Sequence, residues 1–480
     1  MSSNYRDQWA SVGGYFPSHW HFLKLEELLE NAKGIAVGVM YPGDHTAKGI
    51  PLIKVGDVKD GYIASQPSFF ISHEVDEEYK RTRLHGTELL ITLVGKPGDC
   101  VVVEPHMAGW NAARALAVVR LKDISLREWL RYILLSKPAK HLIDARLNTT
   151  VQKTLNLKDI RELGIPIPPK HERDTIIKNV SSIERKKIVS SDINQTLEQM
   201  AQALFKSWFV DFEPVKAKVA VLEAGGSQEE ATLAAMTAIS GKEADALAVL
   251  MREHPEQYAE LKATAELFPS AMQNSELGEI PEGWCHGPLS DIATFANGKV
   301  DVCSLTPETY ISTENMLENR AGISTASSLP SVNIVPEFRC GHVLISNIRP
   351  YFKKIWLARF KGGRSADVLA FEARDSVNVE YVYNLLYQEV FFNFMMLTSK
   401  GVKMPRGDKK AIMDWQCVHP DKKISNAFSK AVGEYYSFIE INNAQNKTLT
   451  QLRDTLLPKL LSGEITLPET EQAIGEVENV

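Results

Sequence analysis

The sequence predicts an α+β protein in which one arrangement of strands and helices occurs twice, each copy ending in a long helix. Between Glu172 and Trp208, apolar residues recur at steps of three and four, which places them on one face of a helix. The stretch from Phe428 to Leu460 repeats this pattern, and each position lies 252 residues after its counterpart. Two matched amphipathic helices can bury their apolar faces against each other, so we expect them to pair.

The segments that precede each long helix also occur twice. A Pro-x-x-Trp step that leads into an amphipathic segment begins at Pro17 and again at Pro281. Apolar strands around a polar turn then predict a β-hairpin in each copy, and a short helix follows each hairpin. The matched segments are the hairpins 89–104 and 343–358 and the short helices 126–135 and 379–388.

Composition divides the chain into six parts. The segment between the copies is rich in Ala, Glu and Leu, which favours helices, and Gly225-Gly226 predicts a break between them. The expected parts are an α/β domain at 1–170, a long helix at 171–214, an acidic helical linker at 215–275, a second α/β domain at 276–421, a long helix at 422–463 and an acidic tail at 464–480.

The negative charge is concentrated in one region. The chain carries a net charge of −6, but 219–283 alone contains twelve acidic and three basic residues, so the remainder is positive. Five scattered cysteines without metal-ligand spacing indicate reduced thiols. No apolar run approaches the roughly 20 residues that cross a bilayer. We expect a cytoplasmic protein with no metal site and no membrane partner.

Three segments carry a family resemblance. They are LEQMAQALFKSWFVDFEPVKAK at 197–218, SELGEIPEGW at 275–284 and LRDTLLPKLLSGEI at 452–465. With these segments and the internal repeat, the chain resembles the specificity subunits of Type I restriction–modification systems from about Trp20 to Ile465. It departs from the family pattern at Arg173, where a glutamine commonly follows the glutamate, and the second copy lacks the proline-rich run found at 165–169.

The resemblance implies two target-recognition domains whose spacer helices form an antiparallel coiled coil. Each domain would recognise one half of an asymmetric, bipartite duplex DNA target, and the chain itself would have no catalytic residue and no cofactor. Its partners would be two modification subunits that methylate adenine with S-adenosylmethionine, and restriction subunits that translocate and cut DNA with ATP and Mg. About 37 helical residues span about 55 Å, which suits holding two domains one to two duplex turns apart.

Polar and basic stretches occupy the same place in both copies. A charge run is most often only a solvated face, but Lys, Arg, Asn, Thr and Gln side chains supply phosphate contacts and base-edge hydrogen bonds. Because the two sets differ in sequence, they predict two different half-sites. The candidate DNA-binding residues are Lys96, Asn148, Thr149, Thr150, Gln152 and Lys153 in the first copy and Arg349, Lys353, Lys354, Lys400, Lys403 and Arg406 in the second.

Large aromatic residues cluster where the first long helix ends. Phe205, Trp208, Phe209 and Phe212 are either core residues of the helix end or a docking site for a modification subunit, since aromatic residues are enriched at interface centres. The apolar stripe is also interrupted, by Lys186 to Ser191 in one helix and by Asn442-Asn443 in the other. Such polar residues either fix the register or mark a docking point.

Two alternatives from other functional classes are a coiled-coil scaffold that does not bind DNA and a stand-alone DNA-modifying enzyme. The segment from Asn347 to Tyr351 distantly resembles the Asn-Pro-Pro-Tyr loop of amino-methyltransferases, but it lacks the paired prolines and no Gly-rich cofactor loop accompanies it. The P-loop pattern Gly-x-x-x-x-Gly-Lys-Ser/Thr is absent from the sequence. Neither methyl transfer nor ATP hydrolysis by this chain is therefore expected.

Overall fold

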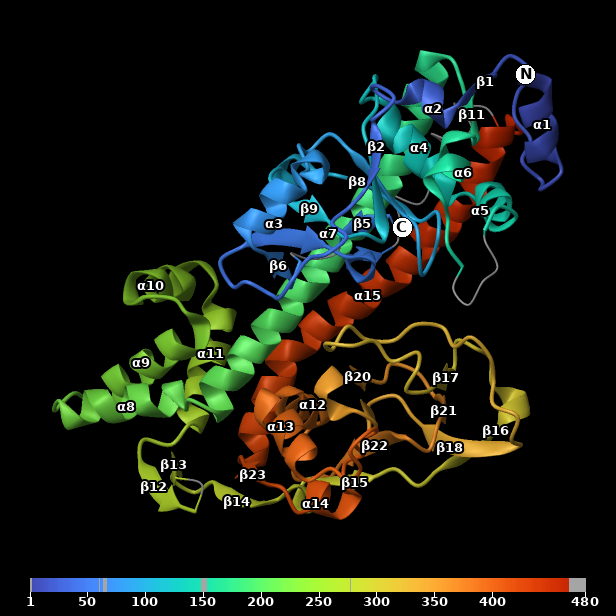
Figure 1. Cartoon of the computed structure of the whole chain (residues 1–480). Coiled ribbons are helices and arrows are strands. Elements are labelled where there is room, and N and C mark those ends of the chain that lie inside the picture. Colours follow the sequence, from blue (N-terminus) through green and yellow to red (C-terminus); the bar gives the residue numbers. More distant parts are fainter. Residues whose placement is uncertain (1, 60, 64–66, 148–152, 277, 466–480) are drawn as a thin grey trace. The chain divides into compact units, whose positions relative to one another are not determined.

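The structure, a computed structural model, describes residues 2–59, 61–63, 67–147, 153–276 and 278–465 (Figure 1). It consists of two compact units, one formed by Met1–Ile188 with Asn446–Val480 and the other by Val189–Gln445. The long helices α7 (Lys170–Phe209) and α15 (Lys422–Ser462) each contribute residues to both units. Among the described residues, no helix is long and apolar enough to span a membrane.

In the described residues, the two units contain the same antiparallel sheet. Its strand order is β2-β10-β7-β8 in the first unit and β15-β22-β19-β20 in the second. Ala117 pairs with Ile91 in the first sheet, and Leu369 pairs with Ile345 in the second. Both pairs face the core that contains the long helices, and the members of the second pair lie 252 and 254 positions later, which confirms the predicted repeat. The strands are β2 (Ile35–Val37), β10 (Leu116–Val119), β7 (Leu89–Thr92), β8 (Cys100–Val102), β15 (Ala293–Phe295), β22 (Val368–Ala373), β19 (Val343–Ser346) and β20 (Ile355–Leu357).

Shorter elements surround the sheet of the first unit. Its helices are α1 (Ser2–Ala10), α2 (Leu25–Leu28), α3 (His73–Glu78), α4 (Leu126–Leu135), α5 (Lys137–Asp144) and α6 (Leu157–Arg161). Strand β1 (His21–Lys24) pairs with β11 (Gly164–Ile167), β4 (Val58–Lys59) pairs with β5 (Tyr62–Ile63), and β3 (Ile50–Ile53) lies between β6 (Phe70–Ile71) and β9 (Asn111–Ala112).

The second unit has matching elements and a helical insertion. Its helices are α12 (Val379–Tyr387), α13 (Glu389–Leu397) and α14 (Lys409–Met413). Strand β14 (Cys285–Pro288) pairs with β23 (Gln416–His419), and β12 (Met272–Ser275) pairs with β13 (Gly278–Pro281). A further sheet has the order β16 (Lys299–Asp301), β18 (Ile334–Phe338), β21 (Gly362–Arg364) and β17 (Tyr310–Ile311).

The acidic linker forms the helices that its composition predicts. They are α8 (Glu213–Glu223), α9 (Gln228–Ser240), α10 (Ala244–Glu253) and α11 (Pro255–Leu267). Gly225 has a φ of 82°, a conformation that costs glycine little, and it separates α8 from α9. The side chain of Ser227 then caps α9 by accepting a hydrogen bond from the backbone N–H of Glu230.

The long helices pack against each other within each unit. In the first unit, Ile176 and Val180 of α7 share a core with Leu456 and Leu460 of α15. In the second unit, Phe205 of α7 contacts Phe428 of α15, whereas Asn194 contacts Asn442. Residue numbers thus rise along one helix as they fall along the other. The predicted antiparallel pairing is confirmed.

The middle of the helix pair differs from the predicted apolar stripe. Ile193 and Met200, expected on the buried face, are each 45% exposed. In their place, Asn194 donates from Nδ2 to Oδ1 of Asn443 at 3.0 Å and accepts from Nδ2 of Asn442 at 2.7 Å. The break at Asn442-Asn443 is therefore an amide contact between the helices, which fixes their register.

A buried charged network joins the α/β domain of the first unit to its long helices. Glu184 of α7 forms an ion pair with Arg131 of α4, and its Oε2 accepts hydrogen bonds from the hydroxyls of Tyr62 at 2.6 Å and Tyr132 at 3.0 Å. Burial raises the pKa of both tyrosines, so their hydroxyls remain protonated donors. Arg453 of α15 lies 3.8 Å from the same carboxylate.

The second unit has a neutral link at the matching positions. Asn384 of α12 corresponds to Tyr132, and Tyr436 of α15 corresponds to Glu184; the Asn384 Nδ2 donates to the Tyr436 hydroxyl at 2.8 Å. Beside it, the Tyr383 hydroxyl donates to Oε1 of Glu198 on α7 at 2.7 Å. Each α/β domain is thus attached to the long helix that follows it and to the other long helix.

We expect Glu184→Leu to lower the free energy of unfolding by about 3 kcal/mol, because it removes the buried carboxylate and leaves the buried Arg131 with only the more exposed Glu128 as its partner. The double variant Arg131→Met with Glu184→Leu should be clearly more stable than Glu184→Leu alone, since it removes both buried charges. Guanidinium unfolding followed by tryptophan fluorescence checks this, with Trp129 reporting from the same core. A double variant no more stable than the single one would contradict the assignment.

The link at Glu198 predicts a pH dependence. Burial raises the pKa of this carboxyl above its ordinary value of 4.5, although the hydrogen bond from Tyr383 acts in the opposite direction. The folded protein then holds the proton more tightly than the unfolded chain, so this stabilising contribution is present below pH 4.5 and is lost as the pH rises through the folded pKa.

We therefore expect Glu198→Gln to become progressively more stable than the wild type between about pH 4 and pH 7. The Gln side chain can still accept the hydrogen bond from Tyr383, and it cannot ionise. Thermal unfolding across this range measures the difference. Asp192→Asn, at an exposed position of the same helix, is the control. A constant difference between Glu198→Gln and the wild type would rule out this role for Glu198.

Candidate nucleic-acid interface

In the second unit, the hairpin turn and the basic loop lie together. The turn at 347–354 joins β19 to β20, and the loop at 399–407 follows α13. The backbone N–H of Arg349 donates to the carbonyl of Pro405 at 2.8 Å, and Ile348 forms a β-bridge with Arg406. Two stretches that sequence analysis singled out separately therefore form one surface, which we call the basic rim.

Close packing fixes the rim. The Asn347 side chain donates from Nδ2 to the carbonyl of Gly407 at 3.2 Å, and a Cβ at Gly407 would lie 2.7 Å from Asn347 Oδ1. A larger residue here would displace the Asn347 side chain. Asn347, the first residue of the segment that resembles a methyltransferase loop, is buried and holds the rim together.

The turn has an unusual backbone. Arg349 and Lys353 have φ angles of 49° and 51°, in the left-handed region that residues with a Cβ rarely adopt. Each such residue costs of order 1 kcal/mol and persists where the surroundings impose it. Here the imposed conformation falls on two residues that the sequence predicted as DNA contacts.

Acidic groups and backbone carbonyls position most of the cations of the rim. Lys353 pairs with Glu389 at 2.8 Å, and Lys354 donates to the carbonyl of Thr313 at 2.8 Å. The remaining contacts are Lys400 with Asp408 at 2.5 Å and Arg406 with Asp367 at 3.2 Å, while the Lys403 side chain lies on the exposed part of the loop.

The first unit repeats this arrangement in part. Val94, at the hairpin turn, forms a β-bridge with Thr154, as Ile348 does with Arg406. Lys96 is exposed on that turn, and Lys153 is exposed next to the bridge. The predicted contacts Asn148, Thr149, Thr150 and Gln152 lie outside the described residues.

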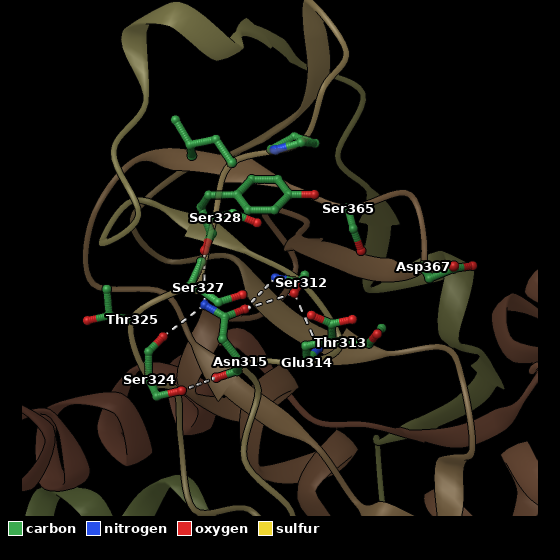
Figure 2. A pocket seen from close by; sticks show the side chains of 14 residues that line it. Ser312, Thr313, Glu314, Asn315, Ser324, Thr325, Ser327, Ser328, Ser365 and Asp367 are labelled. Carbon is green, nitrogen blue, oxygen red and sulfur yellow. Dashed lines mark hydrogen bonds between the residues drawn. The ribbon is translucent and has the colours of Figure 1, made fainter. Parts of the chain in front are cut away.

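A hollow of about 400 Å³ lies beside the basic rim, lined by Tyr310, residues 312–315, residues 324–330, Ser365 and Asp367 (Figure 2). Asn315, only 4% exposed, accepts from the backbone N–H of Ser312 at 2.6 Å and donates to the carbonyls of Tyr310 at 3.0 Å and Ser324 at 2.8 Å. Sequence analysis missed this hollow. The hydroxyl-rich run from Ser324 to Ser328 was the available signal, but nothing in the sequence placed it opposite Ser365.

The aromatic cluster at the end of α7 is buried within the second unit. Phe205, Trp208, Phe209 and Phe212 are 0 to 7% exposed and belong to the core of that unit. Phe209 packs against Tyr381 with a centroid separation of 4.8 Å, and Phe212 packs against Trp284 at 5.9 Å. Because the chain's own residues cover these rings, the structure favours core residues over a docking site.

Comparison with known proteins agrees with this organisation. The family model described as Type I restriction modification DNA specificity domain matches residues 17–199. The Type I restriction enzyme HindI specificity subunit of Haemophilus influenzae is 30% identical over 371 residues, which cover 72% of this chain and 78% of that protein. The MjaIX specificity subunit of Methanocaldococcus jannaschii is 23% identical over 490 residues, with 95% of this chain and 96% of that protein covered. A solved S subunit from M. genitalium has a TM-score of 0.46 at 14% identity, covering 92% and 96% of the two chains.

The matching proteins are DNA-specificity components, a class that recognises sequence and leaves catalysis to other subunits. The chain belongs to the specificity subunits of Type I restriction–modification systems. The two alternative interpretations, a scaffold that does not bind DNA and a stand-alone modifying enzyme, are not supported.

Proposed function

We propose that the basic rim of the second unit and the matching surface of the first unit contact the two halves of a bipartite duplex DNA target. One observation carries this proposal. In both units a β-bridge joins a hairpin turn to a polar loop, so cationic side chains from two separate segments gather at equivalent places. Lysine and arginine on such a surface suit phosphate oxygens, which fix the position of the protein on the duplex.

The difference between the two surfaces supports an asymmetric target. Lys96 and Lys153 stand on the first surface, whereas the second surface carries Arg349 and Arg406 in addition to four lysines, Lys353, Lys354, Lys400 and Lys403. Lysine acts as a compact point charge, whereas arginine presents a planar fork that pairs with guanine or phosphate. Domains that present different donors recognise different sequences.

The partners and cofactors follow from the family. We infer that the chain assembles with modification subunits, which bind S-adenosylmethionine, and with restriction subunits, which use ATP and Mg. A solved relative of this chain is described in the context of complex assembly and conformational transition of the Type I system. The spacer helices would then set the distance between the two half-sites, with Asn194 fixing their register.

Salt dependence tests the DNA contacts. The full chain is assembled with its modification subunits, and its affinity for target duplex is measured. The logarithm of this affinity should fall linearly with the logarithm of the potassium chloride concentration. Lys403→Ala should reduce the magnitude of that slope by about 0.9, the contribution of one phosphate contact. Lys403→Ala combined with Arg406→Ala should reduce it by about twice as much.

Lys242→Ala is the matched control for these variants, because Lys242 is an exposed lysine between α9 and α10, away from the rim in sequence and fold. It should leave the slope unchanged. If Lys403→Ala and Lys242→Ala behave alike, the loop at 399–407 does not contact phosphates. If the wild type shows no salt dependence, the assignment of DNA contact to both surfaces fails.

Shortening the helices tests the spacer role. Deletion of seven residues from each helix, 189–195 and 441–447, removes about 10 Å of rise, which equals about three base pairs. Single-molecule sequencing of methylated adenines should show the same two half-sites with a gap about three base pairs shorter. Removal of the two segments singly should abolish methylation, because the helices then differ in length. An unchanged gap in the double deletion would exclude the spacer role.

A further inference from the structure

The hollow beside the basic rim has a chemistry that differs from that of the rim. Its lining contains two carboxylates, Glu314 and Asp367, together with hydroxyls from serine and threonine. Among the residues that the structure describes around it, none is lysine or arginine. Phosphate is therefore a poor occupant, and a group that donates hydrogen bonds is a good one.

We propose that this hollow recognises a base that presents an exocyclic amino group, cytosine N4 or adenine N6, with Asp367 and Glu314 as the acceptors. The inference rests on the proposed DNA contact of the basic rim and assigns one specificity-determining site within it. Carboxylates that accept a hydrogen bond from an amino group in the major groove distinguish such bases from guanine and thymine, which present oxygen acceptors at the corresponding position.

The hollow adjoins the residues expected to meet the DNA backbone. Arg406 contacts Asp367 through Oδ2 at 3.2 Å, and this ion pair is half-exposed. Lys354 also donates to the carbonyl of Thr313, which lines the hollow. A duplex that rests its phosphates on the rim would therefore lie next to the hollow.

The walls of the hollow are fixed before any ligand binds. Asn315 joins the segment at 310–315 to Ser324 through both ends of its side-chain amide, and Figure 2 shows it between Ser312 and Ser324. The backbone N–H of Ser365 donates to the carbonyl of Ile311 at 2.8 Å, which ties the opposite wall to the same strand. Preorganised acceptors lose little conformational entropy on binding, which favours discrimination between bases.

One buried polar atom in the wall has no protein partner in the described residues. The Ser365 hydroxyl is inaccessible to solvent there and makes no hydrogen bond. A buried hydroxyl without a partner costs free energy. Burial also raises the pKa of Tyr310, so its hydroxyl stays neutral and can act as either donor or acceptor.

The first unit lacks these acceptors at the matching place. The backbone N–H of Ala113 donates to Ile53 as that of Ser365 does to Ile311, and the carbonyl of Ala115 accepts from Leu93 as that of Asp367 does from Asn347. Ser365 and Asp367 are therefore aligned with two alanines, whose side chains offer no hydrogen-bond acceptor. The requirement for an amino-bearing base thus falls on the half-site bound by the second unit.

The test begins with wild-type protein assembled with its modification subunits, whose target is first mapped by single-molecule sequencing of methylated adenines. Each cytosine in the second half-site is then replaced by 2-pyrimidinone and each adenine by purine, which lack the amino group. One replacement should weaken binding by about tenfold to a hundredfold. Equal affinity for every such duplex would overturn the proposal without any variant protein.

Variants identify the acceptors. Asp367→Asn and Glu314→Gln keep the side-chain shape and should broaden the methylated sequence at that one position. Asp375→Asn, an exposed aspartate after β22 in the same unit, is the matched control and should leave the sequence unchanged. Asp367→Asn also breaks the ion pair between Asp367 and Arg406. Arg406→Ala breaks the same ion pair but keeps the Asp367 carboxylate, so it should weaken binding to all sequences without altering the preferred base.

The outcomes separate this proposal from the one on which it rests. If wild-type binding lacks salt dependence, the DNA contact of the rim fails. If binding and specific methylation are normal but Asp367→Asn and Glu314→Gln both keep the wild-type sequence preference, only the assignment of the hollow fails.

Discussion

The packing of the two long helices into both domain cores is the interaction on which the rest of the structure depends. Neither recognition domain closes its core with its own segment alone. The first core takes Leu456 and Leu460 from α15, and the second takes Phe205 and Phe209 from α7. Apolar burial of this kind is the main favourable term in folding, so each helix stabilises the domain that precedes it and the other domain as well.

Two kinds of polar contact add orientation to this apolar packing. At equivalent positions, Tyr132 with Glu184 and Asn384 with Tyr436 link a domain helix to a long helix. The first copy adds the ion pair between Arg131 and Glu184, whereas the link in the second copy is neutral, although the backbone arrangement is the same. The geometry of attachment is therefore repeated, while the chemistry that maintains it is different in the two copies.

The repeat, the hairpins and the long helices could be predicted from the sequence because each depends on local periodicity. The hairpin at 89–104 and the helix α7 required only apolar spacing and turn residues. The exposure of Ile193 and Met200 could not be predicted, because it depends on which residues of α15 face them. The aromatic residues from Phe205 to Phe212 were equally ambiguous, since burial and docking favour the same residue types.

The candidate interface was predicted only in part, for the same physical reason. Cationic loops are visible in composition, so the two segments of the basic rim were identified separately. Their contact depends on a backbone bridge between Ile348 and Arg406. The hollow depends on loops that Asn315 joins, and a single buried amide has no periodic signature.

The contribution of α15 to the first core has a consequence for synthesis of the chain. Domains generally fold in order as they leave the ribosome. Here the sheet that is made first still lacks Leu456 and Leu460 until almost the whole second unit has been translated. The domain nearest the start of the chain is thus completed last, and its apolar surface stays uncovered throughout elongation. Fragments that end before α15 would expose that surface permanently, which makes them substrates for chaperones and proteases.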